Sequence, residues 1–388
     1  MKRILKILAA LAAVLAFGLV LLLHHHEIFK PATGHLSCTV RLLRIEGSGD
    51  LVEGPEDIVV DTARGVAYIS AYNRFRLKAE ISAGGPVTTK GGIFRLDLDD
   101  LPGSGEITVR DLSASFSAFQ PFRPHGMALY APAGRGQALF VINRRHRIEG
   151  GRPRIDPTVE IFDLEGQTIE DLGPPVATIR DPLMCRPNDL VALDNRRFLV
   201  SNDHGACTPG AQFVEERLGW KDAYVLAVEN GRPRIVARGI GFANGLALTP
   251  ASAGRQKLLV SATRDKAVHI YDLEALLAGD GGIEPERSIA LPGSPDNFSW
   301  DAEGRLYLAV FPNIYRFAAY MRGWFGIDTA PGGMVRLDWR SQAEPPFLHI
   351  FPGQTLNGVT VAAPYGEWLM AASGFDNKLL VCERSNDA

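Results

Sequence analysis

Six short motifs recur along the chain, and most of their side chains are of the kind that binds hard metal ions. Each motif is a mostly polar pair followed by an apolar residue, and each precedes a turn and an apolar strand. The six motifs are Glu56-Asp57-Ile58, His125-Gly126-Met127, Asn188-Asp189-Leu190, Asn244-Gly245-Leu246, Asp296-Asn297-Phe298 and Asn357-Gly358-Val359. Their first residues lie 69, 63, 56, 52 and 61 positions apart. This recurrence predicts an internal structural repeat.

The first residues of the six motifs form a set of oxygen donors with one nitrogen base. Two are the carboxylates Glu56 and Asp296, and three are the amides Asn188, Asn244 and Asn357. Ca²⁺ takes six to eight oxygen ligands and accepts neutral amide oxygens beside carboxylates. We therefore predict a bound calcium ion that can polarise a substrate oxygen.

Side chains next to this set add further chemistry. The carboxylates of Asp57 and Asp189 are candidates for a second, more buried calcium site. His125 is the nitrogen base of the set and is a candidate for taking a proton from water. Asp203 and His204 form a second candidate pair, in which Asp203 orients a histidine.

Short strands must position these residues. Apolar segments such as GVAYIS and QALFVIN follow the motifs, with Gly, Pro and Asp turns between them. Six units of roughly 60 residues, each with about four strands, predict an all-β fold, a six-bladed β-propeller. Equivalent positions of propeller repeats share one radius, so the motifs are expected to converge on the central channel. The alternative interpretation is that the Asn-Gly pairs only mark turns.

The composition is that of a globular protein with a signal for export. Of the 388 residues, 46% are hydrophobic and 22% are charged, and the net charge of −3 gives no basic footprint for nucleic acid. Three basic residues among the first six precede an uncharged run over residues 7–23. We expect residues 1–26 to be a membrane-inserted signal anchor, an N-terminal hydrophobic anchor helix, and residues 27–388 an exported propeller domain. A cleaved signal peptide, which leaves a periplasmic or secreted protein, is the alternative.

Four cysteines fit an exported protein. They are Cys38, Cys185, Cys207 and Cys382. Four cysteines allow three disulfide connectivities, and the sequence does not choose among them. A bridge between Cys38 and Cys382 would tie the first folded segment to the last.

The motifs and their order resemble the paraoxonase/arylesterase family of calcium-dependent lactonases, from about Cys38 to Cys382. The matching strings are Gly54-Pro55-Glu56-Asp57, Arg123-Pro124-His125-Gly126, Pro187-Asn188-Asp189-Leu190-Val191-Ala192, Ser201-Asn202-Asp203-His204, Gly241-Phe242-Ala243-Asn244-Gly245 and Pro295-Asp296-Asn297. The resemblance implies a six-bladed propeller with two calcium ions in its channel. It also implies a ring-closing disulfide between Cys38 and Cys382.

The resemblance further implies roles for individual residues. The catalytic calcium is implied to bind Glu56, Asn188, Asn244, Asp296 and Asn297. The structural calcium is implied to bind Asp57, Asp189 and the backbone carbonyl of Met127. Asn357 is then left to line the channel.

Two positions depart from the family pattern. His125 resembles the first histidine of the family's catalytic dyad, but Arg144 stands where the second is expected. His146, two residues later, is a candidate replacement on the same face of the strand. Phe311 stands where the family often has a pocket histidine. Both departures bear on the substrate and leave the metal ligands untouched.

Together these observations predict a calcium-dependent carboxylic ester hydrolase, an arylesterase or lactonase. Calcium would polarise the carbonyl of a small-molecule ester or lactone, and water would attack with help from histidine. The alternatives are a sugar-lactone hydrolase of the gluconolactonase type and a non-catalytic exported binding propeller. Residues 314–327, which are aromatic and basic, are expected to form a lid, a membrane-facing element or an inter-blade connection. Phe75, Phe213 and Trp220 are candidates for the substrate mouth.

Overall fold

The strands form six four-stranded antiparallel blades. The computed structural model describes residues 9, 11–18, 36–84, 86–119, 121–132, 136–165 and 169–384. Blade 1 contains β2 (Pro55–Asp61), β3 (Val66–Tyr72), β4 (Gly91–Asp97) and β5 (Gly105–Asp111). Blade 2 contains β6 (Pro124–Tyr130), β7 (Ala138–Asn143), β10 (Thr158–Asp163) and β11 (Ala177–Ile179). Blade 3 contains β12 (Pro187–Ala192), β13 (Phe198–Asn202), β14 (Ala223–Glu229) and β15 (Arg232–Ile240).

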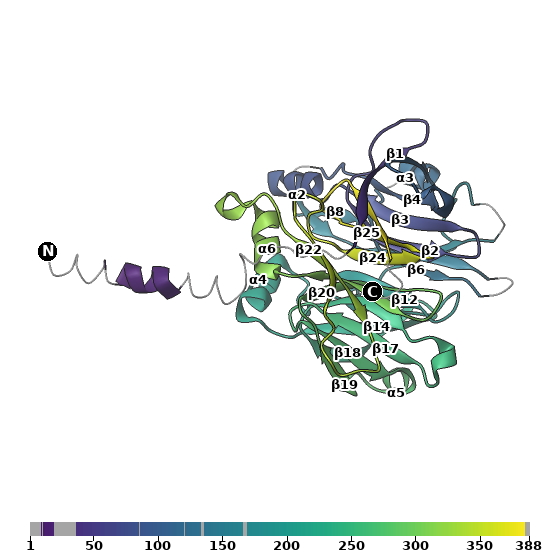
Figure 1. Ribbon diagram of the computed structural model, residues 1–388. Helices are drawn as coiled ribbons and strands as arrows, with labels where there is room; N and C mark the ends of the chain where they lie inside the picture. The colour runs from purple at the N-terminus through teal and green to yellow at the C-terminus, as the bar shows by residue number, and fades with distance from the viewer. Residues whose placement is uncertain are drawn as a thin grey trace.

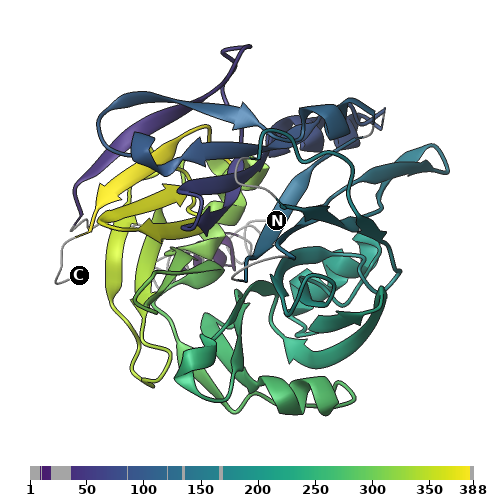
Figure 2. The ribbon, with the colours of Figure 1, turned by 90° about the vertical axis from the view of Figure 1, so that its right-hand side faces the viewer.

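Blades 4 to 6 complete the ring. Blade 4 contains β16 (Ala243–Leu248), β17 (Lys257–Ala262), β18 (Ala267–Asp272) and β19 (Arg287–Ala290). Blade 5 contains β20 (Ser294–Trp300), β21 (Leu306–Phe311), β22 (Gly332–Leu337) and β23 (Phe347–Phe351). Blade 6 contains β24 (Val361–Tyr365), β25 (Trp368–Ala372), β26 (Leu379–Glu383) and β1 (Cys38–Ile45). The first strands contact one another in the order β2, β6, β12, β16, β20, β24 and back to β2. Figure 2 shows the blades around a common centre. The predicted six-bladed, propeller-like arrangement is therefore present.

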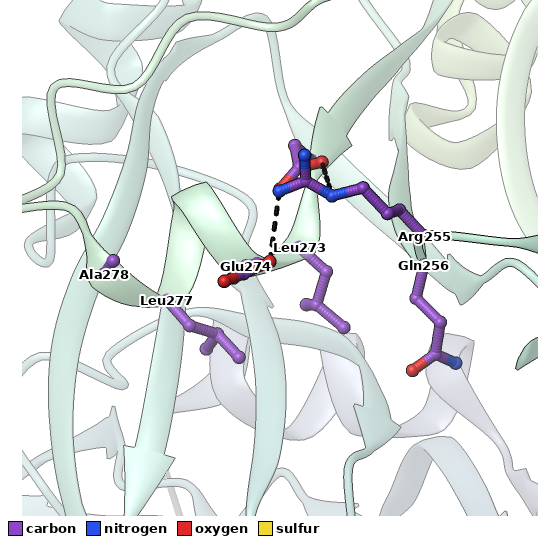
Figure 3. A pocket seen from close by; sticks show the side chains of 7 residues that line it. Arg255, Gln256, Leu273, Glu274, Leu277 and Ala278 are labelled. Atoms are coloured by element: carbon purple, nitrogen blue, oxygen red, sulfur yellow. Dashed lines mark hydrogen bonds and ion pairs between the residues drawn. The ribbon is translucent and has the colours of Figure 1, made fainter.

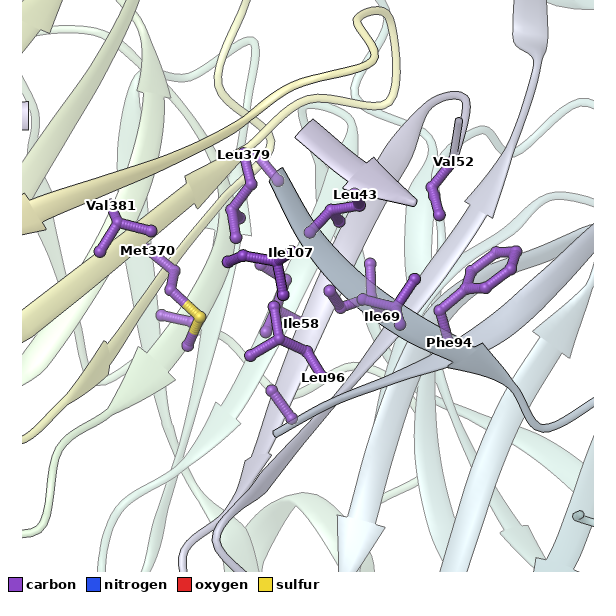
Figure 4. Close-up of a cluster of buried hydrophobic side chains, with 14 of the residues drawn as sticks. Leu43, Val52, Ile58, Ile69, Phe94, Leu96, Ile107, Met370, Leu379 and Val381 are labelled. Carbon is purple, nitrogen blue, oxygen red and sulfur yellow. The ribbon is translucent and has the colours of Figure 1, made fainter. Parts of the chain in front are cut away.

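The last blade is closed by the first strand of the folded region. Strand β1 pairs antiparallel with β26 and parallel with β5, so the first and last blades form one eight-stranded sheet. A buried apolar cluster fills the space between these two blades, with side chains such as Leu43, Ile107 and Leu379 in contact (Figure 4). The disulfide between Cys38 and Cys382 covalently joins β1 to β26, as the family resemblance implied. Cys185 pairs with Cys207.

Short helices make the chain mainly β rather than all β. They are α2 (Arg74–Ala83), α3 (Ala114–Phe119), α4 (Pro209–Leu218), α5 (Leu273–Ala278), α6 (Ile314–Arg322) and the 3₁₀ turns η1 (Leu98–Asp100), η2 (Ala251–Ala253) and η3 (Trp324–Gly326). Helices α2, α4 and α6 join the second to the third strand of blades 1, 3 and 5. The hairpin β8 (His146–Glu149)–β9 (Arg152–Ile155) takes the same place in blade 2. Figure 1 shows these elements together on one side of the ring.

Capping residues set the ends of helices α2, α4 and α6. The side chains of Asn73, Thr208 and Asn313 accept hydrogen bonds from backbone N–H groups in the first turn. Gly84, Gly219 and Gly323 end the helices with left-handed backbone geometry, which costs little without a Cβ. Segment 314–327 thus connects two strands of one blade rather than two blades.

The N-terminal segment is described only in part. Residues 11–18 are helical and exposed, whereas most of the predicted anchor, including the run of three histidines, lies outside the described residues. Among the helices that the structure describes, none has the length and apolar character needed to cross a membrane. The anchor therefore stays a prediction.

Candidate metal centre

A β-bulge occurs at the polar pair in five of the six first strands. The pairing register with the second strand shifts between Pro55 and Asp57, Pro124 and Met127, Pro187 and Leu190, Ala243 and Leu246, and Pro295 and Phe298. A bulge withdraws residues from the ladder and redirects their side chains. Each bulged pair lies at the start of a first strand, so its side chains lie at the same end of the ring. In the sixth blade Asn357 precedes β24, which pairs without a bulge.

Two glycines allow the first strands to approach one another at the bulges. A Cβ on Gly126 would lie 2.5 Å from the carbonyl oxygen of Asn188. A Cβ on Gly245 would lie 2.4 Å from the carbonyl oxygen of Asp296. Both distances are shorter than side chains tolerate, so the glycines of these two motifs are required by packing between blades.

Three asparagine amides present free oxygens to the same space. The nitrogen of Asn188 donates to Asp203 (3.4 Å), that of Asn244 to Thr263 (3.2 Å) and that of Asn297 to Glu56 (3.5 Å). The Oδ1 atoms of all three amides and Oε2 of Glu56 are buried without a hydrogen-bond partner. Unpartnered buried oxygens are costly unless a cation binds them. This donor set, neutral amides with carboxylates, fits Ca²⁺.

The charges of the buried carboxylates also fit a cation. Burial raises the pKa of Glu56, although Arg74 and Arg144 oppose the shift. Burial and then Glu56 raise the pKa of Asp296 well above its ordinary range. No cluster of three or more His, Cys, Asp or Glu side chains within the described ranges is arranged for a metal, because amides supply most of this donor set.

Asp57 and Asp189 are held by backbone groups of the neighbouring first strands. Asp57 accepts a hydrogen bond from the N–H of Met127 at 2.7 Å, and Asp189 accepts one from the N–H of Leu246 at 2.7 Å. Burial and then Glu56 raise the pKa of Asp57 to about 8. Burial and then Asp57 raise the pKa of Asp189 well above its ordinary range. The charge of Asp57 thus acts on Asp189, and the second calcium site stays a prediction.

His125 lies beside the carboxylate end of the donor set. Its Nδ1 is 2.7 Å from Nη2 of Arg74 and 3.3 Å from Oε2 of Glu56. Its Nε2 is buried and has no hydrogen-bond partner. Burial, then Arg144 and Arg74, hold the pKa of His125 well below its usual range, so the ring is neutral at neutral pH.

Asp203 is the centre of a second polar network. It bonds to Arg144 and Arg186, each at 3.2 Å, and to Nδ1 of His204 at 2.6 Å. Burial opposes ionisation of Asp203, but Arg186, His204 and Arg144 hold its pKa well below the ordinary value. Burial alone would lower the pKa of His204, but hydrogen bonds to Asp203 and Glu216 raise it. The network joins the centre through Asn188.

His146 lies outside strand β7. Strand β7 ends at Asn143, and His146 begins the separate hairpin β8–β9. The expectation that His146 continues the face of β7 is therefore wrong, because the chain turns at Arg144 and Arg145. Arg144 instead occupies the space near Asp203, where it also donates to the carbonyl of Pro187 at 2.9 Å.

Aromatic side chains surround the mouth of the site. Phe311 stacks on Phe317 of α6 with ring centroids 4.1 Å apart, and Phe75 of α2 meets Tyr320 of α6 edge-on at 5.7 Å. Residues of α2 and α6 line a pocket of about 240 Å³, whose charged lining residues are Arg74, Glu53 and Asp376. Phe75 thus lines the pocket. Phe213 and Trp220, on and just after α4, are exposed.

Another pocket lies away from the donor set. It has a volume of about 510 Å³ and lies beside α5, where Arg255 forms ion pairs with Asp272 and Glu274 (Figure 3). None of its lining residues belongs to the predicted site.

Sequence reasoning missed several groups that shape the centre. Arg74 has no local signal, because it follows β3 and reaches the site only through the fold of α2. Thr263 and Thr360 also lie outside the motifs, and Thr360 Oγ1 donates to the carbonyl of Glu56 at 2.7 Å. Arg186 directly precedes the Pro187-Asn188 motif, and this adjacency is the signal that could have found it.

Comparisons with known proteins give matches over most of the chain. Residues 63–384 match the family model described as Arylesterase. Human serum paraoxonase/arylesterase 1 is 28% identical over 85% of this chain and 86% of its own length. Human serum paraoxonase/lactonase 3 is 25% identical over 86% of this chain and 87% of its own length. Among solved structures, regucalcin from Agrobacterium tumefaciens aligns with a TM-score of 0.43 and 12% identity over 86% of this chain and 92% of that chain. The match of the family model to most of the chain shows that this protein belongs to the arylesterase (paraoxonase) family.

Proposed function

We propose that this protein is an exported, calcium-dependent hydrolase of aryl esters and lactones. The observation that carries the proposal is the set of buried, unpartnered oxygens at the centre of the ring. The proposed ligands of the catalytic calcium are Glu56, Asn188, Asn244, Asp296 and Asn297, and those of the structural calcium are Asp57, Asp189 and the carbonyl of Met127. Calcium bound there would polarise the ester carbonyl and stabilise the charge that develops on its oxygen.

The side chains of the protein would orient the calcium ligands and transfer a proton. Asp203 and Thr263 bind the amide nitrogens of Asn188 and Asn244. The amide oxygens are therefore directed into the site before calcium binds. This preorganisation lowers the cost of forming the charged centre. The free Nε2 of His125 is the proposed contact for the attacking water or the ester oxygen. His204, clamped between Asp203 and Glu216, holds Asp203 ionised.

Two disulfides support export, because disulfides persist in oxidising compartments. We propose that residues 1–26 anchor the propeller domain, residues 27–388, to a membrane. Detergent extraction of the full chain from sodium carbonate-washed membranes tests this proposal. Release by the carbonate wash alone would contradict it.

The hydrolase proposal is tested with the full chain on phenyl acetate, γ- and δ-lactones and glucono-δ-lactone. We expect hydrolysis that a chelator abolishes and that added Ca²⁺ restores. Turnover of glucono-δ-lactone alone would favour a sugar lactonase. Bound calcium without turnover of any of these substrates would favour a non-catalytic binding propeller and contradict the proposal.

A further inference from the structure

Three arginines near His125 lie close to few negative charges. Arg144 and Arg186 share one carboxylate, Asp203, which also bonds to His204. Arg74 lies 3.8 Å from Glu56, which is a proposed calcium ligand. When calcium balances the ligand carboxylates, the three guanidinium groups remain against Asp203 and Glu216, both of which act on Arg186. An excess of positive charge therefore lies beside the proposed reaction centre.

These charges act strongly because they are shielded from water. The side chains of Arg74 and Arg144 are 10% and 14% exposed, and that of Arg186 is 25% exposed. Coulombic interactions grow as the surrounding dielectric falls. One of these guanidinium groups reaches the site itself, because Nη2 of Arg74 lies 2.7 Å from Nδ1 of His125.

Arg186 has hydrogen-bonding capacity that the protein does not use. Its Nε donates to Asp203 at 3.2 Å, while its two Nη atoms make no hydrogen bond with the described part of the chain. A guanidinium fork with free Nη atoms matches the two oxygens of a carboxylate or phosphate. The partial exposure of Arg186 leaves this fork accessible.

Further cations lie at the mouth of the site. Arg264 lies 3.4 Å from Nε2 of His204, and Arg322 of α6 lies 3.4 Å from Glu216 of α4. Lys78 of α2 binds the carbonyl of Met321 in α6. Arg264 and Arg322 share one carboxylate, Glu216, and positive charge beside a site raises the association rate of anionic ligands.

We propose that this site selects esters or lactones that carry a second, anionic group, a carboxylate or phosphate, which Arg186 binds and the charge of Arg144 attracts. The inference rests on the proposed ester hydrolase function. Arg186 is the contact residue for the anionic group, and Arg144 adds charge from the position where the family pattern has a histidine.

The test compares 4-acetoxybenzoate with its neutral methyl ester. We expect the calcium-loaded full chain to show a kcat/KM for the anionic ester about tenfold above that for the neutral ester. The Arg186→Gln variant should lower this ratio about tenfold, mainly through KM of the anionic ester. The Arg197→Gln variant is the matched control, because Arg197 lies at the opposite end of the β12–β13 hairpin and pairs with Asp194. It should leave the ratio unchanged.

A second arm measures binding without chemistry. The amides 4-acetamidobenzoate and methyl 4-acetamidobenzoate are resistant analogues whose binding is measured by calorimetry. Tighter binding of the anionic amide, weakened in Arg186→Gln and by added salt, supports the inference even where ester turnover fails. Equal binding of the two amides, or a ratio that Arg186→Gln does not change, overturns the inference even where neutral esters are hydrolysed.

Discussion

Nη2 of Arg74 lies 2.7 Å from Nδ1 of His125, and both side chains are largely buried. A guanidinium has donors and no acceptor, so Nδ1 must accept this hydrogen bond. The proton of the neutral ring is therefore on Nε2, the atom without a protein partner. In this arrangement His125 reaches a substrate oxygen or water as a hydrogen-bond donor. To act as a base it would first have to release Arg74.

Two substitutions distinguish whether His125 acts as a hydrogen-bond donor or as a base. Glutamine at this position offers an N–H donor but no base, whereas alanine offers neither. We expect His125→Ala to lower kcat about 100-fold and His125→Gln to retain about a tenth of wild-type kcat. Steady-state rates with phenyl acetate measure both. Equal losses in the two variants would show that His125 acts as a base.

His146 provides the comparison for this experiment. It lies in the hairpin β8–β9 and makes no hydrogen bond or ion pair with His125 in the described structure. We expect His146→Ala to change kcat by less than about threefold, since a proton passes between two side chains only along a hydrogen bond. A loss as large as that of His125→Ala would restore His146 as the dyad partner.

Calcium affinity should depend on Asn244 and not on Asn357. Asn244 has a free buried oxygen, whereas Oδ1 of Asn357 accepts a hydrogen bond from the N–H of Ala330 at 3.0 Å. We expect Asn244→Ala to weaken calcium binding at least about tenfold, because a ligand oxygen is lost. Asn357→Ala should leave the affinity within about threefold. Titration calorimetry of the metal-free chain tests both, and an equal loss would place Asn357 in the centre.

The two disulfides should contribute unequally to stability. Cys38–Cys382 joins residues 344 positions apart, and Cys185–Cys207 joins residues 22 positions apart. In the chain-entropy model a longer closed loop stabilises more, by about 2 kcal/mol for this difference. We expect Cys38→Ala/Cys382→Ala to lower the denaturant midpoint more than Cys185→Ala/Cys207→Ala. The reverse order would show that ring closure depends mainly on the pairing of β1 with β26.

The stability contribution of Asp265 should vanish in acid. Burial opposes ionisation, but hydrogen bonds from His269, Lys221 and the N–H of Gly241 lower the pKa of Asp265 to about 2. A carboxyl whose folded pKa lies below its unfolded pKa stabilises the fold above the unfolded value, near pH 4, and loses that effect as pH falls toward 2. We expect Asp265→Asn to cost about 1–2 kcal/mol at pH 7.

Urea unfolding of the wild type and of Asp265→Asn from pH 3 to pH 7 measures this contribution. The gap between the two proteins should shrink steadily as the pH falls below 4. A gap that stays constant over this range would mean that the substitution acts through packing near Gly241 and not through charge.

The sequence by itself determined the repeat and the residues offered to a metal. A repeat of roughly 60 residues implies equivalent sites in each unit. Polar pairs before otherwise apolar strands are explained if the pairs converge on the central channel. Propeller symmetry then placed Glu56, Asn188 and Asn244 at one end of the ring, because equivalent strand positions share a radius. The close approach of blades at Gly245, which leaves no space for a Cβ, was seen only in the structure.

Only the tertiary structure decided which atoms are free and which charges face them. Asp57 meets the N–H of Met127, and Glu56 meets Asn297, across 70 and 241 residues of sequence. Such contacts depend on how neighbouring blades dock, and no local pattern encodes them. The sequence also did not indicate that β7 ends before His146, or that Arg74 reaches the site from α2. Hydrogen bonds and Coulombic interactions act over a few ångströms of space, so the fold that sets those distances also sets the chemistry.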